Sequence, residues 1–378
     1  MDRYTVTAYK DLDKYENLWV NGELTHSGRR HPFLDFSWFK IYAKHFLNEN
    51  SINIQIYREK DKITIFPMAR ANDIFQKTSL MGRKIFDYGD IITNSNNFSL
   101  ITDFLENSKT CMAEFFNVRE DSPLQYWAKQ LSAQSGKKWQ TLIVDSVKSP
   151  YVSLEGNTWD DYFKRLSRNF KDTTKRKIKK MASLGKIHFG YCKDESEAAE
   201  VFETMCRQHI ERRKYLGQSK SIFLNKKTKL FYREINQKMI LDSKMLLFYL
   251  KLNSEIIAVT QCFLRDKVIY YYMPTFDLKY SACSPGRVLL YYIIKFGFED
   301  GMKEVDFMIG DEEYKLRWNA RIRQTRDIYF FKKNILGQAA FLRARMQIFN
   351  RRVKEKLIKS KVKDIRRAVL KRLYKLGA

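Results

Sequence analysis

Two acidic residues near the end of the chain stand where a proton-transfer site could form. Asp306 lies within the apolar run Val305–Phe307, and Asp311 follows Gly310. A carboxylate inside a buried strand is costly unless it is paired or functional, so Asp306 is either the partner of a nearby cation or a base. Asp311 is either the N-cap of a short helix or a second functional acid, because aspartate caps helices well.

A histidine and an arginine form an H-x-x-R pattern, at His209 and Arg212, late in an expected helix. A lone histidine on a helix is more often structural, so a packing role and a catalytic role both stay open. The other histidines show no metal-ligand spacing with carboxylates or cysteines, and we expect no metal site. They are His26, His31, His45 and His188.

Apolar periodicity and turn residues predict the elements that would position these groups. In the second half we expect the order β-α-α-β-β-β-α-β-α-β. The strands are Lys186–Tyr191, Met245–Leu252, Glu255–Arg265, Lys267–Pro274, Lys303–Gly310 and Arg326–Lys333, and the helices are Glu195–Gly217, Leu224–Ser243, Pro285–Gly301 and Asp311–Asn319.

The first half repeats this order without obvious residue identity. Its expected strands are Tyr4–Tyr9, Ile52–Arg58, Lys62–Arg70, Lys77–Phe86, Met112–Val118 and Trp139–Val144, and its expected helices are Asp11–Trp19, Ser37–Asn48, Asn97–Asn107 and Leu124–Gln134. The repetition predicts two α/β domains, residues 1–148 and 149–334, followed by a tail at 335–378. The boundary should fall near the polar stretch Lys148–Pro150.

The 378 residues carry a formal net charge of +27, which favours anionic partners such as nucleic acid, lipid headgroups or phosphorylated ligands. Five cysteines without a C-x-x-C pair indicate a reducing compartment. The N-terminus has no apolar signal region, and the strongest apolar run, Met245–Leu252, is too short to span a bilayer. We therefore expect a cytoplasmic location.

Positive charge is concentrated at residues 164–186 and again in the tail, where 343–375 holds fourteen Lys or Arg and two acids. The tail also has an apolar stripe at helical spacing that includes Leu342, Met346, Phe349 and Val353. Three interpretations stay open: a docked helix with a solvated basic face, an interfacial helix on anionic lipid at the inner face of the membrane, or a nucleic-acid contact. We expect the tail to serve location rather than chemistry.

The second half resembles the acetyltransferase domain of the GNAT superfamily, in the branch of cellulose-biosynthesis CelD/BcsL-like proteins. The resemblance lies in the H-x-x-R pattern, Ser284–Leu290, Asp306–Trp318 and the basic stretch Leu166–Gly185. In the first half it lies in His31–Phe33, Trp38 and Asp87–Asp90. The architecture is also similar to the Fem transferases. The resemblance implies two tandem GNAT-like domains, each with a mixed, largely antiparallel sheet flanked by helices.

The same resemblance implies roles for particular side chains. Tyr314 would donate a proton to the leaving thiolate, and Lys315, as in Fem-type enzymes, would stabilise charge on the acyl carbonyl. Asp306 would act as a base or orient an incoming amine. The remaining catalytic candidates are Asp311 and His209, and the expected acceptor-binding residues are Asp87, Tyr88, Asp90, Arg212 and Trp318.

The expected donor site is the turn Ser284, Pro285, Gly286 and Arg287, which opens a helix. GNAT proteins hold the pyrophosphate of acyl-CoA with a glycine-rich turn, whereas this turn has one glycine. Free N–H groups at a helix N-terminus can still bind phosphate, and Ser284 and Arg287 add a hydroxyl and a charge. The departure keeps two donors open, acetyl-CoA or another acyl-CoA, and aminoacyl-tRNA.

These features together predict an acyl-CoA-dependent N- or O-acyltransferase without a metal. Its acceptor would be a small molecule or glycan, such as an amino sugar or a polysaccharide precursor, attacking the thioester directly. The alternatives are a Fem-like transferase that uses aminoacyl-tRNA and a non-catalytic accessory protein that binds membranes or nucleic acid.

Overall fold

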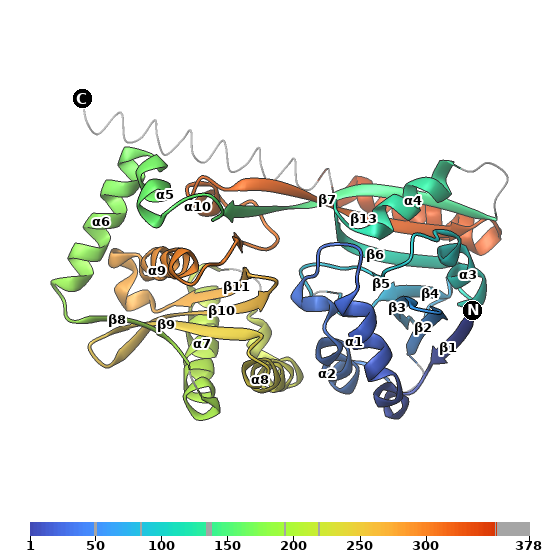
Figure 1. Ribbon diagram of the computed structural model, residues 1–378, viewed down its shortest axis with the longest axis horizontal. Helices are drawn as coiled ribbons and strands as arrows, with labels where there is room; N and C mark the ends of the chain where they lie inside the picture. Colours follow the sequence, from blue (N-terminus) through green and yellow to red (C-terminus); the bar gives the residue numbers. More distant parts are fainter. Residues whose placement is uncertain are drawn as a thin grey trace.

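The computed structural model describes residues 1–48, 51–83, 85–133, 138–192, 194–217, 220–351 and 353. These residues form two α/β halves that share one sheet (Figure 1). Most neighbouring strands in the sheet are antiparallel, and helices flank it. The expected fold class is therefore confirmed.

The first half begins with short elements and ends with a long strand. Its strands are β1 (Asp2–Val6), β2 (Ile52–Glu59), β3 (Lys62–Arg70), β4 (Lys77–Leu80), β5 (Ile92–Thr93), β6 (Met112–Arg119) and β7 (Trp139–Ser153). Its helices are η1 (Tyr9–Tyr15), α1 (Glu16–Leu24), η2 (Pro32–Leu34), α2 (Phe36–Phe46), α3 (Ser99–Asn107) and α4 (Pro123–Ala133).

The second half contains longer helices. They are α5 (Trp159–Arg165), α6 (Arg168–Ala182), α7 (Glu195–Tyr215), η3 (Ile222–Leu224), α8 (Lys226–Leu241), η4 (Leu278–Cys283), α9 (Pro285–Glu299) and α10 (Glu313–Leu316). Its strands are β8 (Ile187–Tyr191), β9 (Met245–Leu252), β10 (Glu255–Arg265), β11 (Val268–Phe276), β12 (Glu304–Asp306) and β13 (Arg321–Lys332). A helix follows at residues 335–351.

Several segments differ from the expected elements: β7 and β13 are longer, the expected helix Asp11–Trp19 is divided between η1 and α1, and three other segments are much shorter. The strand expected at Lys77–Phe86 ends at Leu80, and the strand expected at Lys303–Gly310 ends at Asp306. The helix expected at Asp311–Asn319 shortens to α10. In the last two cases the chain leaves regular structure because the segment between β12 and α10 forms the wall of a cavity.

In the described part of the chain the sheet runs in the order β1-β2-β3-β4-β6-β13-β7-β12-β11-β10-β9-β8, with β5 beside β3. The two parallel pairs are β4 with β6 and β11 with β12. Each parallel pair therefore occupies the same position in the strand order of its own half. The structure thus supports an internal repeat at the level of topology.

The last strand of each half pairs with the other half. β7 follows the first half in sequence, yet its end pairs with β12, where Tyr151 lies opposite Asp306. β13 follows the second half, yet it pairs with β6, where Tyr329 lies opposite Glu114. β7 and β13 also pair antiparallel with each other and join the halves (Figure 1). The polar residues Lys148–Pro150, which suggested a linker, lie inside β7.

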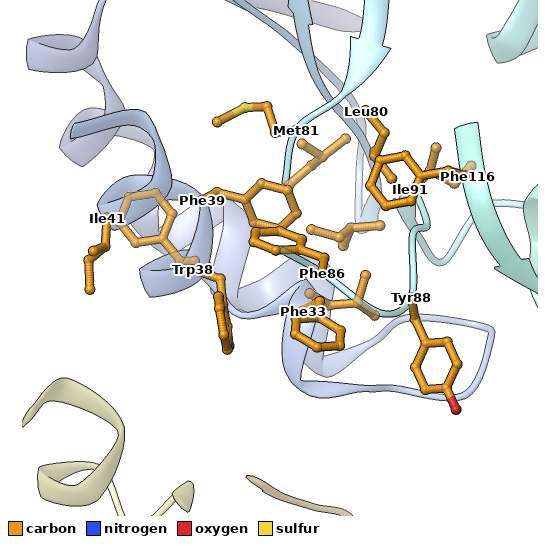
Figure 2. Packing of buried hydrophobic residues seen from close by; sticks show 14 of the residues in the cluster. Phe33, Trp38, Phe39, Ile41, Leu80, Met81, Phe86, Tyr88, Ile91 and Phe116 are labelled. Carbon is orange, nitrogen blue, oxygen red and sulfur yellow. The ribbon is translucent and has the colours of Figure 1, made fainter. Parts of the chain in front are cut away.

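An aromatic core lies between α2 and the strands. Phe33 stacks on Phe86 with ring centroids 5.3 Å apart and meets Trp38 edge-on at 5.0 Å. Figure 2 shows these rings with Phe39 among the buried residues of the first half. Trp38 also contacts Phe263 of β10 at 5.2 Å, so the core continues into the second half. The H-P-F motif and Trp38 are thus packing residues.

The helix at 335–351 packs on one face of the sheet. Ala340 and Ala344 are buried against a small apolar cluster that includes Tyr329 and Phe331 of β13. The stripe expected to be this helix's apolar face, with Leu342 and Met346, is exposed instead. The small side chains of Ala340 and Ala344 allow the helix to approach the sheet closely, so the helix docks through this face and not through the expected stripe. The tail beyond residue 353 lies outside the described residues.

None of the helices that the structure describes is long and apolar enough to cross a membrane.

Candidate active site

A cavity of about 400 Å³ lies between the two halves. The second half supplies most of its wall, from the end of β11, the segment 307–309, α10 and the late turns of α7. The first half contributes Asp87, from the loop between β4 and β5. Five residues that the sequence singled out therefore meet here: Asp87, His209, Arg212, Tyr314 and Lys315.

Asp87 is the carboxylate best placed for proton transfer. Desolvation raises its pKa to about 7, while the charge of Lys315 and the Ile309 backbone N–H favour the ionised form. A base with a pKa near neutrality is suited to accept a proton at physiological pH. Among the acceptor-binding candidates, Asp87 thus lines the cavity with a carboxyl group whose pKa lies near neutrality.

Lys315 is held firmly at the floor of the cavity. Its side chain is buried, and its ammonium donates to the carbonyls of Ile309 at 2.9 Å and Gly310 at 3.1 Å. It also pairs with Glu312 Oε2 at 2.8 Å. These three contacts use the three N–H donors, so Lys315 acts on the cavity through its charge and through the backbone that it holds.

Tyr314 and His209 are both uncharged in the neutral pH range. Desolvation, followed by the charge of Glu312, raises the pKa of the Tyr314 phenol. Burial lowers the pKa of His209 to about 4, and Arg213 and Arg212 add to this effect. His209 Nδ1 also hydrogen-bonds Ser221 Oγ at 2.7 Å, which fixes the ring. Tyr314 can therefore donate a proton, whereas His209 can only accept or relay one.

Positive charge lines the side of the cavity formed by α7. The Arg212 guanidinium lies 4.9 Å from the centroid of the Phe276 ring. Arg213 also lines the cavity. This side of the cavity is therefore suited to an anionic group on a ligand.

Asp306, expected as a base, is fully buried and paired. It accepts hydrogen bonds from Tyr88 Oη at 2.7 Å and from Arg119 Nη1 at 3.1 Å. The Met308 backbone N–H also donates to it at 2.8 Å. Asp306 does not line the cavity, so the pairing alternative describes its geometry. It instead holds the segment 307–309, which does line the cavity.

Four other predicted site residues lie away from the cavity lining. Asp311 is exposed, 3.8 Å from the Lys148 ammonium, and Glu312 rather than Asp311 is the N-cap of α10. Trp318 is buried and meets Phe170 edge-on at 4.9 Å. Tyr88 belongs to the Asp306 network, as described above.

The fourth of these residues, Asp90, is buried beside Ser122. It accepts a 2.6 Å hydrogen bond from Ser122 Oγ and one from its neighbour's backbone N–H. Desolvation raises its pKa to about 7. Of the D-Y-G-D motif, only its first residue, Asp87, therefore faces the cavity, while Tyr88 and Asp90 stabilise the loop around it.

The predicted donor turn borders a second cavity of about 310 Å³. Arg287 lines it with Phe170 and Arg317, and the Arg287 guanidinium lies 5.2 Å from the Phe170 ring centroid. Ser284 is the N-cap of α9 and has a left-handed backbone, with φ of +53°. Neither Ser284, Pro285 nor Gly286 lines this cavity. The turn places their backbone at the helix N-terminus above it.

Phe276 lies close to both sites. The Arg212 guanidinium is 4.9 Å from its ring centroid, and a Cβ placed on Gly286, in the turn beside the second cavity, would lie 3.4 Å from its ring. Sequence reasoning missed Glu312 and Arg213 as cavity residues. No sequence pattern distinguishes Glu312 from its acidic neighbours, and only the fold shows its contact with Lys315.

No group of three or more His, Cys, Asp or Glu side chains among the described residues could hold a metal ion.

Comparison with known proteins relates this architecture to others. Residues 168–316 match the family model described as Acetyltransferase (GNAT) domain. The chain is similar to the crystal structure of FemX, with 10% identity, a TM-score of 0.59, and coverage of 88% of this chain and 98% of that chain. No curated protein sequence matches this chain.

Two further solved structures are similar. A conserved protein of unknown function from Bacteroides thetaiotaomicron VPI-5482 has 11% identity over 87% of this chain and 99% of its own, with a TM-score of 0.55. The C-terminal domain (DUF2156) of a protein named as a lysylphosphatidylglycerol synthetase, from Agrobacterium fabrum, has 9% identity over 89% and 95%, with a TM-score of 0.53.

At these identities the structural matches show the fold alone. The family match adds sequence evidence over the part of the second half that contains His209, Arg287 and Tyr314. The chain therefore shares the fold of these structures, and residues 168–316 of its second half match the model of the GNAT acetyltransferase domain.

Proposed function

We propose that the protein is an acyl-CoA-dependent N- or O-acyltransferase of the CelD/BcsL-like branch. Its acceptor is an amino sugar or another precursor of a cell-envelope polysaccharide. The observation that carries the proposal is the cavity between the halves. There Asp87, with a pKa of about 7, faces Lys315 and Tyr314 of the acetyltransferase domain.

The proposed reaction is a direct transfer. The acceptor nitrogen or oxygen attacks the thioester carbonyl, its proton passes to Asp87, and a new bond to the acyl carbon forms. The tetrahedral intermediate then collapses and breaks the carbon–sulfur bond. Tyr314, whose phenol stays protonated at neutral pH because desolvation raises its pKa, gives its proton to the leaving thiolate.

Lys315 supports this reaction by charge rather than by a new hydrogen bond. Its ammonium is already bonded to Ile309, Gly310 and Glu312. A fixed positive charge beside the cavity favours both ionised Asp87 and the developing oxyanion. Arg212 supplies a further cation for an anionic group on the acceptor.

The donor is proposed to lie over the second cavity. Arg287 and Arg317 supply charge for its phosphates, and α9 points its N-terminus at the same place. Phe276 lies close both to Arg212 of the acceptor cavity and to Gly286 of the donor turn, so donor and acceptor would meet near it.

The proposal is tested by acetyl-CoA binding and thiol release. We expect acetyl-CoA to raise the thermal midpoint of the protein. Amino sugars and sugar nucleotides are then offered as acceptors, and free thiol is measured. Turnover should fall strongly in Asp87→Asn and stay unchanged in Asp61→Asn, because Asp61 is an exposed carboxylate outside the cavity. The absence of any acetyl-CoA binding would contradict the proposed donor.

A second candidate is an aminoacyl-tRNA-dependent transferase. It is favoured by the cations that α6 exposes beside the second cavity, among them Arg168, Lys175 and Arg176. A polyanionic donor would bind such a surface. If the protein binds tRNA tightly and acetyl-CoA not at all, this second candidate replaces the first.

A further inference from the structure

The helix at residues 335–351 has two apolar faces, and the sheet covers only one. Ala340 and Ala344 are buried against the cluster around Tyr329 and Phe331. Leu342, Met346 and Phe349 are exposed by 64%, 64% and 65%. Exposure this large for three bulky apolar side chains on one helix is unusual in a soluble surface.

The exposed side chains form one stripe. At 100° per residue, Leu342, Met346 and Phe349 lie within a narrow sector, roughly half a turn away from Ala340 and Ala344. Val353, also exposed, lies on the same stripe. The stripe therefore points away from the sheet, and the docked face anchors it in this orientation.

Positive charge borders the stripe. The sequence from Ile335 to Val353 contains four arginines and no acidic residue. The Arg343 guanidinium lies 5.2 Å from the centroid of the Phe75 ring, and that of Arg345 lies 5.6 Å from the centroid of the Phe341 ring. At 100° per residue, positions 343 and 345 fall on opposite sides of the apolar stripe.

We propose that this outward face docks the protein on an anionic lipid surface. An apolar stripe of Leu, Met and Phe with flanking arginines has the chemistry of a helix that lies in the plane of a membrane interface. The apolar side chains would enter the acyl boundary, and the arginines would meet lipid phosphates.

Charge excludes the main competing occupants. A second copy of this helix would bring arginine against arginine, because a two-fold contact places the same residues opposite one another. Nucleic acid would pair with the arginines but would leave Leu342, Met346 and Phe349 without a partner, since its affinity comes mainly from phosphate contacts. An anionic bilayer satisfies both the apolar and the charged groups.

The proposal is independent of the proposed chemistry. The helix lies over the first half, at the opposite end of the molecule from α6 and α9 (Figure 1). Its outward residues line neither the acceptor cavity nor the donor cavity. Changing them should therefore leave thiol release from a soluble acceptor intact.

The test uses the full chain and vesicles of phosphatidylcholine with or without phosphatidylglycerol. We expect co-sedimentation with the anionic vesicles, weakened by salt. The triple variant Leu342→Ser, Met346→Ser, Phe349→Ser should bind at least about tenfold less, because each residue loses apolar burial. A matched triple variant at Leu224, Leu230 and Leu241, which are exposed on and before α8, should bind like the wild type.

A spectroscopic readout separates insertion from simple attraction. The five native cysteines are buried, so Phe349→Cys can be labelled with an environment-sensitive dye. Its emission should shift to the blue with anionic vesicles, whereas the same dye at Leu230→Cys should not respond. Equal vesicle binding by the serine variant, or an unchanged dye at residue 349, would overturn the proposal. A wild-type dimer that the serine variant abolishes would also overturn it, in favour of self-association.

Discussion

The Tyr88 hydroxyl donates a 2.7 Å hydrogen bond to Asp306 Oδ1 and so joins the two halves of the chain. Arg119, also of the first half, donates from Nη1 to the other carboxylate oxygen, Asp306 Oδ2, at 3.1 Å. Asp306 in turn accepts from the Met308 backbone N–H beside the cavity. The shape of the cavity thus depends on a buried network to which both halves contribute.

Removal of the Asp306 carboxylate should destabilise the fold. Asp306→Ala removes one of the two carboxylates that pair with the buried Arg119, the other being Asp121, and we expect a loss of about 3 kcal/mol in the free energy of unfolding. Tyr88→Phe removes the hydroxyl that bonds both Asp306 and Ser149 and should cost about 1–2 kcal/mol. Urea denaturation measures both, with the exposed Asp311→Ala as control. Normal stability of Asp306→Ala with lost turnover would instead indicate a catalytic Asp306.

The pH dependence of turnover should report Asp87. Because its pKa is about 7 and the ionised form accepts the proton, kcat/KM should rise with pH and level off above about pH 7. Asp87→Asn should lower turnover by about 10²–10⁴-fold and remove this rise. A rise that persists unchanged in Asp87→Asn would assign it to another group.

Asp87 should also make stability depend on pH. Its folded pKa of about 7 lies above the ordinary value of 3.8, so the folded chain holds this proton more tightly than the unfolded chain. The stability that it contributes is therefore present below about pH 4 and is lost as pH rises to about 7. Relative to the wild type, Asp87→Asn should gain about 1–3 kcal/mol between about pH 5 and pH 8. Urea denaturation at both values measures the difference, and a constant difference would contradict this account.

Charge reversal at the donor cavity should weaken acetyl-CoA binding. Arg287→Glu and Arg317→Glu each place a carboxylate beside the proposed phosphate position, and we expect at least about a tenfold rise in Kd. Lys138→Glu is the control, since its side chain is exposed on the first half. Unchanged calorimetric affinity in both cavity variants would move the donor elsewhere.

The exchange of β7 and β13 predicts how the chain can be divided. A fragment of residues 1–148 would end within β7 and would lack β13, which pairs with both β6 and β7. It would therefore leave an edge of β6 and of β7 without a neighbouring strand. Such open edges favour aggregation. We expect this fragment to form no cooperatively unfolding monomer, as judged by sedimentation and thermal denaturation. A stable monomeric fragment would support a domain boundary at 148.

Local sequence was sufficient for most elements and for the repeated order. The helix Pro285–Glu299 begins with proline and its predicted end coincides with a glycine, so local chemistry determines its position. The segment Asp306–Trp318, which the sequence singled out, contributes Tyr314 and Lys315 to the lining of the cavity. The sequence could not show which acid of this segment is paired in the core and which lines the cavity. The environment of Asp306 depends on Tyr88 and Arg119, which are distant in sequence.

The sequence by itself determined the amphipathic elements, the fold class and the basic, apolar character of the tail, because these follow from periodicity and composition over a few turns. The tertiary structure alone decided three matters. It brought Asp87 into the cavity, exchanged β7 and β13 between the halves, and docked the tail helix through Ala340 and Ala344. Each depends on contacts between residues that are far apart in the chain. No local sequence pattern specifies which strand edge will pair with another, or which surface will receive a helix face with small side chains.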